Sequence, residues 1–398
     1  MKQTPGQIFR RFLRFGFLAW GGPVAQIAMI RKELVDEEKW VTKEHFNRAL
    51  AVYQALPGPE AQELCVYFGM RAGGRLGGFL AGLAFMLPGL LLILLLTWVY
   101  TRFGINSPLV QVVFAGIQAA VIALIVFAVY RIGKHAVVNK ALMAIALAAA
   151  VAFALGTNFL IILSAAGLAY LCWNKNNRIM AAVVMLALAA ATTFTVYNKG
   201  LPNVKAIIAQ PGQPRERSND QLKVFATGLK GGLLTFGGAY TAIPFIQRDA
   251  VQDNKWMTQE QFLDGIALSG ILPAPLIIFS TFVGYFGGGW TGALLITLGI
   301  FLPAFTFTLL GHSLLEKLIA HPGLHSFLDG ITAGVVGLIA ATAIQLFIAT
   351  ITNITAIIIF TLALGILIKF RSKYTIVFVI AGAGLLSLAL KYAANFIS

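Results

Sequence analysis

The chain has 398 residues, of which 58% are hydrophobic and only 11% charged, and its mean hydropathy is +0.82. Apolar runs long enough to cross a bilayer recur along it, which excludes a soluble globular protein and indicates an all-α polytopic membrane protein. The net charge of +15 does not indicate nucleic-acid binding, because the basic residues lie singly or in pairs between apolar runs, where they orient membrane helices.

The sequence contains an internal repeat. Residues 20–46, WGGPVAQIAMIRKELVDEEKWVTKEHF, return as FGGAYTAIPFIQRDAVQDNKWMTQEQF at 236–262, an offset of 216 residues without a gap. A duplicated half in a membrane protein is typical of transporters. We predict a first repeat at 1–197 with one additional transmembrane helix, a polar linker rich in proline and glycine at 198–221, and a second repeat at 222–398.

Each repeat begins with a segment that a pair of glycines interrupts, Gly21-Gly22 in the first repeat and Gly237-Gly238 in the second. Pro23 suits the first turn of a helix that starts after the first pair. Further along, each repeat carries a basic-acidic doublet, Lys32-Glu33 or Arg248-Asp249. Ion pairing at the membrane interface and direct contact with a substrate are both open for these doublets.

A pair of short segments follows in each repeat, and the two members of a pair meet at Pro57-Gly58-Pro59 or Pro273-Ala274-Pro275. At 1.5 Å per residue such segments reach only about 16–21 Å, whereas the hydrocarbon core is about 30 Å thick. Each pair is therefore one broken membrane helix or a re-entrant hairpin, and both place unwound backbone at membrane depth, where it must be buried or line a cavity. The half-helices are predicted at 43–56, 60–70, 259–272 and 276–286.

The start of the first half-helix carries the same signals in both repeats. Thr42 and Thr258 are predicted N-cap residues, the second of them within a full capping box. The tryptophan two positions before each cap, Trp40 or Trp256, is interpreted as an anchor at the membrane interface.

The long apolar spans number five in the first repeat and four in the second. Equivalent segments separated by an odd number of crossings face opposite sides, so we predict inverted repeats with about 13 transmembrane segments if each short pair crosses as a broken helix. Arg71 and Arg75 support this inversion, because the equivalent loop in the second repeat carries no charge and the basic loops there lie at the alternate connections. The spans are predicted at 79–102, 107–131, 140–155, 157–173, 178–197, 289–312, 325–349, 354–369 and 373–396.

The four breaks are candidate parts of one substrate site. Helix N-termini that converge at membrane depth provide free backbone N–H groups and the positive end of the helix dipole, which together bind an anion. Kinks that allow close helix packing are the alternative interpretation. The predicted substrate-binding residues are Gly21, Gly22, Pro23, Gln26, Pro57, Gly58, Pro59, Gly237, Gly238, Pro273, Ala274 and Pro275.

Glu60 follows Pro59 directly, at the start of a half-helix, and its counterpart in the second repeat is Leu276. The helix dipole favours a carboxylate there, but the same carboxylate would repel an anion in the pocket. We hypothesise that Glu60 gates the site, with Glu63 one turn on sharing this role; a purely structural cap is the alternative. Lys32 and Arg248 are the basic candidates for gating or coupling.

Both halves carry a set of characteristic motifs: Gly21–Gln26, Arg31–Val35, Leu56–Ala61, Gly77-Gly78 through Leu87-Pro88, Phe236–Tyr240, Pro273–Ile277 and Val283-Gly284. These motifs resemble those of the chromate ion transporter family, in its long two-repeat form. The second break in that family is usually Pro-Gly-Pro, whereas this chain has Ala274 in place of the glycine. The resemblance implies a multi-pass protein of the bacterial inner membrane that exports chromate and confers resistance to it.

Other functions remain open at this stage. Chromate and sulfate are tetrahedral dianions of similar size, so sulfate is a plausible competitor, and a transporter or exchanger of sulfate or another oxyanion and an anion channel are alternatives. We expect no enzyme, because His321, His325 and Glu316 lie in a loop without a metal-binding helix motif. We also expect no metal, cofactor or disulfide, since Cys65 and Cys172 lie in apolar runs. The lipid bilayer is the expected surrounding, and a homodimer is left open.

Overall fold

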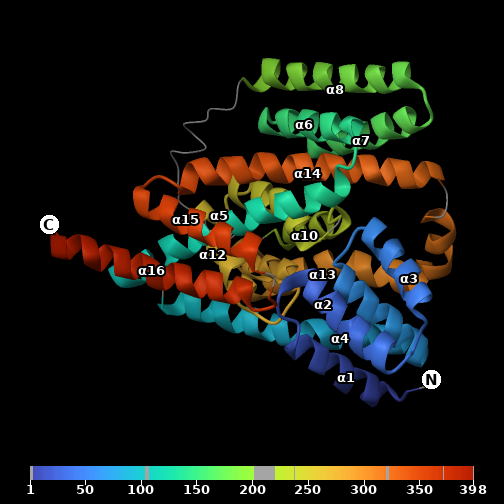
Figure 1. The fold of residues 1–398 in the computed structure, drawn as a ribbon, viewed down its shortest axis with the longest axis horizontal. Coiled ribbons are helices and arrows are strands. Elements are labelled where there is room, and N and C mark those ends of the chain that lie inside the picture. The colour runs from blue at the N-terminus through green and yellow to red at the C-terminus, as the bar shows by residue number, and fades with distance from the viewer. Residues whose placement is uncertain are drawn as a thin grey trace. The chain divides into compact units, whose positions relative to one another are not determined.

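The computed structural model describes residues 3–103, 107–200, 220–236, 238–319, 322–370 and 372–397, which form helices and short connections (Figure 1). Gly237, His321 and most of the predicted linker at 198–221 lie outside the described residues. The chain divides into two compact units, each of which takes segments from both repeats. Unit 1 comprises Met1–Leu124, Pro211–Ser313 and Asn353–Ser398, and unit 2 comprises Ile125–Gln210 and Leu314–Thr352.

Unit 2 is a helical bundle in which α14 packs against α6 and α7, and α7 packs against α8 (Figure 1). Its contacts are close because small residues meet large ones: a side chain on Gly167 would overlap the ring of Phe327. Asn174 also donates a hydrogen bond to the hydroxyl of Ser326 at 2.6 Å. The four helices are α6 (Lys140–Ala154), α7 (Phe159–Asn174), α8 (Arg178–Lys199) and α14 (Pro322–Thr350).

All nine predicted long spans are helices in the structure, and α8 is the last of the five in the predicted first repeat. Among the described residues six helices are long and apolar enough to cross a membrane, while α6, α7 and α15 are shorter. The polytopic helical membrane class is therefore confirmed, and the expected 13 segments remain a prediction. The remaining long helices are α4 (Glu60–Phe103), α5 (Pro108–Ala136), α13 (Phe279–Ile319), α15 (Ile354–Lys369) and α16 (Thr375–Ile397).

Within unit 1 the two repeats form the same series of short elements, in agreement with the repeat read from the sequence. A helix is followed by a glycine break, a second helix, a π-helix and then the first half-helix. In the first repeat these are α1 (Pro5–Phe17), α2 (Gly22–Arg31), η1 (Lys32–Glu37) and α3 (Lys43–Ala55). In the second they are α10 (Gln221–Leu233), η2 (Ala239–Ala242) with α11 (Ile243–Gln247), η3 (Arg248–Asp253) and α12 (Gln259–Gly270), after which η4 (Leu276–Ile278) leads into α13.

Both α4 and α13 contain a tight glycine turn, at Gly73-Gly74 and Gly288-Gly289, that divides each into a short arm and a long arm. Gly74 and Gly289 each adopt a φ of 64°, which favours glycine. The arms of α4 then run antiparallel in close contact, since a Cβ on Gly69 would lie 2.4 Å from the Ala81 side chain. The short arms are the predicted second half-helices, and the long arms are the predicted spans.

The first half-helix folds back on the short arm in each repeat. In the first repeat Phe46 stacks on Phe68, with ring centroids 6.3 Å apart, and His45 hydrogen-bonds the hydroxyl of Tyr67. In the second, the rings of Phe262 and Phe279 meet edge-on at 5.6 Å. The structure therefore favours the re-entrant hairpin over the broken membrane helix.

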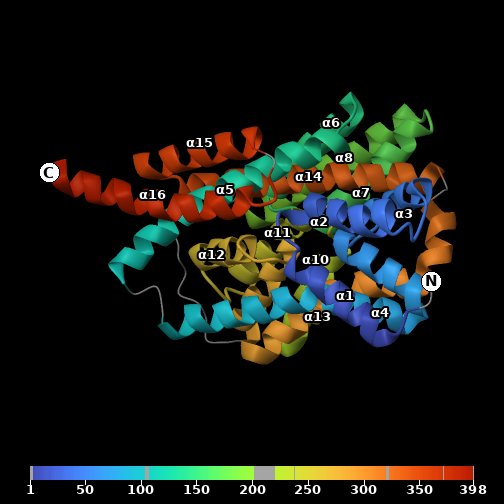
Figure 2. The same ribbon diagram turned by 60° about the horizontal axis from the view of Figure 1, so that its bottom comes forward.

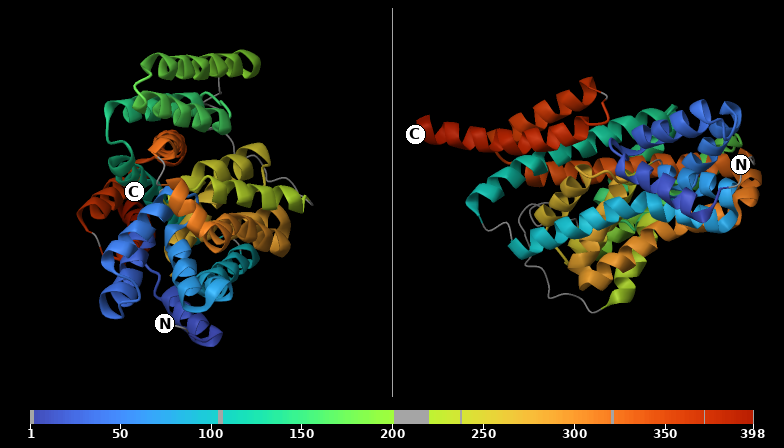
Figure 3. Two further views of the ribbon diagram at one scale, coloured as in Figure 1. Left: turned by 90° about the vertical axis from the view of Figure 1, so that its right-hand side faces the viewer. Right: turned by 90° about the horizontal axis from the view of Figure 1, so that it is seen from below.

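The long arms of α4 and α13 cross within unit 1 and run in opposite directions. A side chain on Gly78 would meet Leu309, and one on Gly82 would meet Phe305, so residue numbers rise along one helix as they fall along the other. Figures 2 and 3 show the same opposed course of the two helices.

The helix caps agree with the sequence, but one tryptophan does not. Thr42 accepts a hydrogen bond from the backbone N–H of His45, and Thr258 forms the predicted capping box with Gln261. Trp256 is only 3% exposed and packs against the Gly287 backbone. Its interpretation as an interface anchor is therefore wrong, because the ring is buried inside the protein.

An equivalent ion pair joins the first helix to the π-helix in both repeats. Arg14 pairs with Glu33 in the first repeat, and the Lys230 ammonium lies 2.6 Å from the Asp249 carboxylate in the second. The two pairs differ in burial, because the Arg14 side chain is 57% exposed whereas those of Lys230 and Asp249 are 26% and 12% exposed.

We predict that Lys230→Met lowers the free energy of unfolding by about 2 kcal/mol, because it leaves the Asp249 carboxylate buried without its cation. The matched variant Arg14→Met is expected to cost less than about 1 kcal/mol, since water screens the exposed pair. Thermal or denaturant unfolding in detergent measures both. Equal losses for the two variants would show that burial does not distinguish the pairs.

Candidate functional site

The glycine pairs interrupt the helices as predicted. Leu18 caps the C-terminus of α1, and Gly21 and Gly22 then adopt φ of 87° and 77° before α2 begins, with Pro23 in its first turn. In the second repeat Gly238, at φ 123°, precedes η2. Each break therefore places a helix N-terminus, with its unbonded backbone N–H groups, in unit 1.

Gln26 joins the first glycine break to the proline break of the other repeat. Its side chain is fully buried, and its amide nitrogen donates to the carbonyl oxygens of Ala19, at 2.8 Å, and Ala274, at 3.1 Å. The amide oxygen of Gln26 has no hydrogen-bond partner among the described residues. The predicted residues Gln26 and Ala274, 248 positions apart, thus belong to one site.

The reciprocal contact connects the proline break of the first repeat to the second repeat. The backbone N–H of Gly58 donates to the carbonyl oxygen of Thr235 at 2.8 Å, just before the second glycine break. Thr235 is the counterpart of Ala19, whose carbonyl Gln26 binds. The proline break of each repeat therefore lies beside the glycine break of the other.

Ala274 fits because the residue that faces it on α4 is a glycine, Gly89. A Cβ on Gly89 would lie 2.3 Å from the Ala274 methyl, and on the other side a Cβ on Gly58 would lie 3.3 Å from the Ala304 methyl. Gly89 and Ala304 follow Pro88 and Pro303, which correspond in the two repeats. The contact is thus the same twice, with glycine and alanine exchanged.

The first proline break carries two buried acids. Glu60 and Glu63 lie in the first turn of the short arm of α4 and are 7% and 0% exposed. Neither carboxylate oxygen of Glu63 has a hydrogen-bond partner among the described residues, and a Cβ on Gly58 would lie 2.8 Å from one of them. The acid therefore points at the break.

The second proline break has no such acids. Leu276, Ile278 and Phe279 occupy the first positions after it, and all three are buried. The acids of the paired breaks therefore come from the first repeat, where the amide oxygens of Gln26 and Gln62 also lack partners within the described ranges.

Lys32 and Arg248 make ion pairs within their own π-helices. Lys32 lies 3.8 Å from Glu37, and its side chain is 77% exposed, while Arg248 lies 3.8 Å from Asp253. Among the other predicted residues, Pro59 and the three residues of the second proline break are buried, whereas Gly21, Gly22, Pro23 and Pro57 are partly exposed.

The sequence reading missed three residues at the paired breaks: Thr235, Gln62 and Gly89. Two of them had a readable signal. Gln62 is a polar residue at the start of a short apolar segment, and Gly89 follows the proline that corresponds to Pro303.

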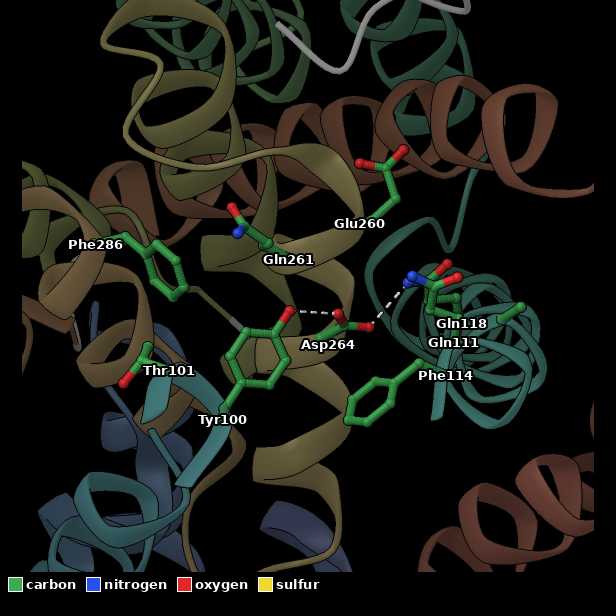
Figure 4. A pocket seen from close by; sticks show the side chains of 10 residues that line it. Tyr100, Thr101, Gln111, Phe114, Gln118, Glu260, Gln261, Asp264 and Phe286 are labelled. Carbon is green, nitrogen blue, oxygen red and sulfur yellow. Dashed lines mark hydrogen bonds between the residues drawn. The ribbon is translucent and has the colours of Figure 1, made fainter. Parts of the chain in front are cut away.

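Each re-entrant hairpin opens into a pocket at its mouth. The first-mouth pocket, of about 630 Å³, is lined by residues of the loop before α3, by the start of α3 and by Arg71. The second-mouth pocket, of about 680 Å³, lies between α12, the end of α4 and the start of α5 (Figure 4). Figure 4 shows Asp264 in this pocket, where it accepts hydrogen bonds from Tyr100 at 2.7 Å and Gln118 at 2.9 Å.

Comparison with known proteins gives a consistent result. The model of the family described as "Chromate transporter" matches twice, at residues 6–172 and 222–388. A chromate transport protein of Pseudomonas aeruginosa is 52% identical over 95% of this chain and 91% of its own length. A chromate transport protein of Cupriavidus metallidurans is 32% identical over 97% of this chain and 93% of its own length. A probable chromate transport protein of Synechococcus elongatus is 30% identical over 85% of this chain and 84% of its own length. No solved structure matches significantly.

Proposed function

Since the chain belongs to the chromate transporter family, we propose that it is a secondary transporter that exports chromate across the bacterial inner membrane and thereby confers resistance to it. The substrate lies at the paired breaks, where the helix N-termini of both repeats converge. Uncharged backbone N–H groups and helix dipoles provide the attraction there.

The observation that carries this proposal is the reciprocal contact between breaks. Gln26 binds the Ala274 carbonyl, and the Gly58 N–H binds the Thr235 carbonyl, so the proline break of each repeat is hydrogen-bonded to the glycine-break region of the other. The antiparallel course of α4 and α13 supports an inverted arrangement of the repeats around it. Irregular backbone buried among helices is the usual setting of a transporter's substrate site.

Energetics favour export. A dianion that leaves a cell with a negative interior gains about 4.6 kcal/mol per 100 mV, twice the single-charge value. Since a tenfold gradient corresponds to about 1.4 kcal/mol, this potential alone sustains roughly a thousandfold lower concentration inside. Export therefore needs no coupling ion, whereas import of the same dianion would need one.

Two alternatives are kept because of specific features. A site made of backbone N–H groups separates chromate poorly from sulfate, so transport or exchange of sulfate or another oxyanion is the second candidate. An anion channel would share the re-entrant hairpins, but it would show flux that does not saturate at low substrate concentration.

The decisive experiment is chromate flux in proteoliposomes that hold the purified protein, with an imposed membrane potential and with or without sulfate on the opposite side. We expect flux that saturates, follows the potential and changes when sulfate is added. Absence of chromate flux under every gradient would refute the proposed substrate, and flux of sulfate alone would favour the second candidate.

Glu60 is expected to act as a gate in this cycle. Its carboxylate sits at a helix N-terminus in the path of an anion, so it must be displaced or neutralised when the substrate binds. We predict that Glu60→Gln changes the rate of chromate flux and flattens its dependence on pH. Flux measured between pH 6 and 8 tests this, and a variant with the wild-type rate and pH profile would leave Glu60 as a structural cap.

A further inference from the structure

The two mouth pockets have opposite charge although they occupy equivalent places in the repeats. Four lysines and arginines line the first-mouth pocket, together with His45 and a single acid, Asp36. The four basic residues are Lys39, Lys43, Arg48 and Arg71.

The second-mouth pocket contains two acids, Glu260 and Asp264, and none of the described residues that line it is basic. Asp264 is 1% exposed, and its hydrogen-bond donors, Tyr100 and Gln118, are both neutral (Figure 4). Its ionised form is therefore stabilised by dipoles rather than by a cation among the described lining residues.

The reversal occurs at matching positions. Arg48 and Asp264 are 216 residues apart, the offset of the repeat, so one site in the half-helix carries a cation in one copy and an anion in the other. Beyond the proline breaks the offset is 215, as the glycine turns at Gly74 and Gly289 show, so Arg71 corresponds to Phe286, which lines the second-mouth pocket. Loop charges that only orient a membrane protein do not require this exchange, because Arg48 and Asp264 lie inside α3 and α12 rather than in a connection.

The two pockets lie at opposite ends of one membrane-length helix. Arg71 stands just before the glycine turn from which the long arm of α4 starts, and Tyr100 stands near the end of that arm. At 1.5 Å per residue this arm extends about 40 Å, more than the hydrocarbon core of about 30 Å. The pockets therefore open toward opposite sides of a membrane that this helix crosses.

We infer that the first-mouth pocket is the capture site for a tetrahedral oxyanion and that the acidic second-mouth pocket is the exit, whose charge opposes the return of the anion. This inference rests on the proposed function. Arg71 adjoins the basic loop that contains Arg75, and the positive-inside rule predicts that such a loop is cytoplasmic. Capture then occurs from the cytoplasm. The charge difference between the pockets makes the KM for chromate lower in export than in uptake.

The physical basis is the electrostatic concentration of a ligand in a charged cleft. A cleft lined by one sign of charge raises the local concentration and the association rate of an oppositely charged ligand by about 10- to 1,000-fold. The electrostatic energy of a dianion in such a cleft is twice that of a monovalent ion. An acidic cleft lowers the local concentration of an anion. The two mouth pockets together therefore make the apparent affinity for chromate depend on the side from which it enters.

The test measures the KM for chromate separately in inside-out and right-side-out membrane vesicles. Loss of either arginine, in Arg48→Gln or Arg71→Gln, is expected to raise the KM at the cytoplasmic face about tenfold while the KM at the opposite face stays within twofold. Arg48→Lys keeps the charge and is expected to restore most of the affinity. Asp264→Asn is expected to lower the KM at the opposite face severalfold.

Lys175→Gln is the matched control, because it removes an exposed positive charge from unit 2. If wild-type protein carries chromate and the arginine variants keep its KM at both faces, the capture site is refuted while the proposed function stands. An equal rise of KM at both faces also refutes it, since that result indicates a structural role. If the wild-type protein carries no chromate at either face, the proposed function itself fails.

Discussion

A methyl group added at Gly89 is expected to abolish transport. In Gly89→Ala the new Cβ would lie 2.3 Å from the methyl of Ala274, far inside van der Waals contact, and both positions are on fixed backbone. Overpacking of this kind costs about 1–3 kcal/mol. Here it would also push the second proline break away from Gln26, whose amide binds the Ala274 carbonyl at 3.1 Å. Chromate flux and thermal unfolding in detergent measure the two effects.

The same contact provides a rescue. Ala274→Gly removes the methyl that Gly89→Ala would strike, so the double variant is expected to recover most of the lost stability and flux, with a coupling energy of about 1–3 kcal/mol. Gly365→Ala serves as the control, because a Cβ there, in α15, meets nothing within 4 Å. A double variant as impaired as Gly89→Ala would show that the two residues do not act through their contact.

Glu63→Gln is expected to stabilise the protein and to lower its maximal rate of chromate transport. The buried carboxyl has no hydrogen-bond partner for either oxygen within the described residues, so its ionised form is costly, and a neutral amide of the same size removes that cost. The amide can no longer ionise beside Gly58, so an anion at the break is bound more tightly and released more slowly. We therefore expect the KM for chromate to fall, the maximal rate to fall about tenfold and the melting temperature to rise.

The matched control for this prediction is Glu44→Gln, which neutralises an exposed glutamate in the first turn of α3. Glu63→Asp, which keeps the charge on a shorter side chain, is expected to retain more of the maximal rate than Glu63→Gln. Should Glu63→Gln keep the wild-type KM and maximal rate, the carboxyl would only fill space at the break.

Much of the architecture was readable from the sequence because it follows local rules. The Gly21-Gly22 break, the helix start after Thr42 and the Thr258 capping box depend on neighbouring residues, and the structure confirms them. The fold-back of α3 on the short arm was not readable, because a broken helix and a hairpin have the same segment lengths. The stacking of Phe46 on Phe68 decides between them, and it is a tertiary contact.

The candidate site shows the same division. Gln26 and Ala274 were both expected at an anion site, but their hydrogen bond depends on how the repeats pack and has no signature in either segment. Trp256 was misread because its burial depends on packing against Gly287, a tertiary contact that composition does not indicate. By contrast, the exchange of Arg48 for Asp264 is visible in the repeat alignment and gains its meaning only when the pockets are located.

The exchanged glycine and alanine also determine which halves fit each other. Gly58 of the first repeat faces Ala304 of the second, and Ala274 of the second faces Gly89 of the first. Two copies of the second half, arranged in the same way, would place two methyl groups where one fits, and two copies of the first half would leave both places empty. The two halves are therefore no longer self-complementary: each half fits the other half and does not fit a second copy of itself.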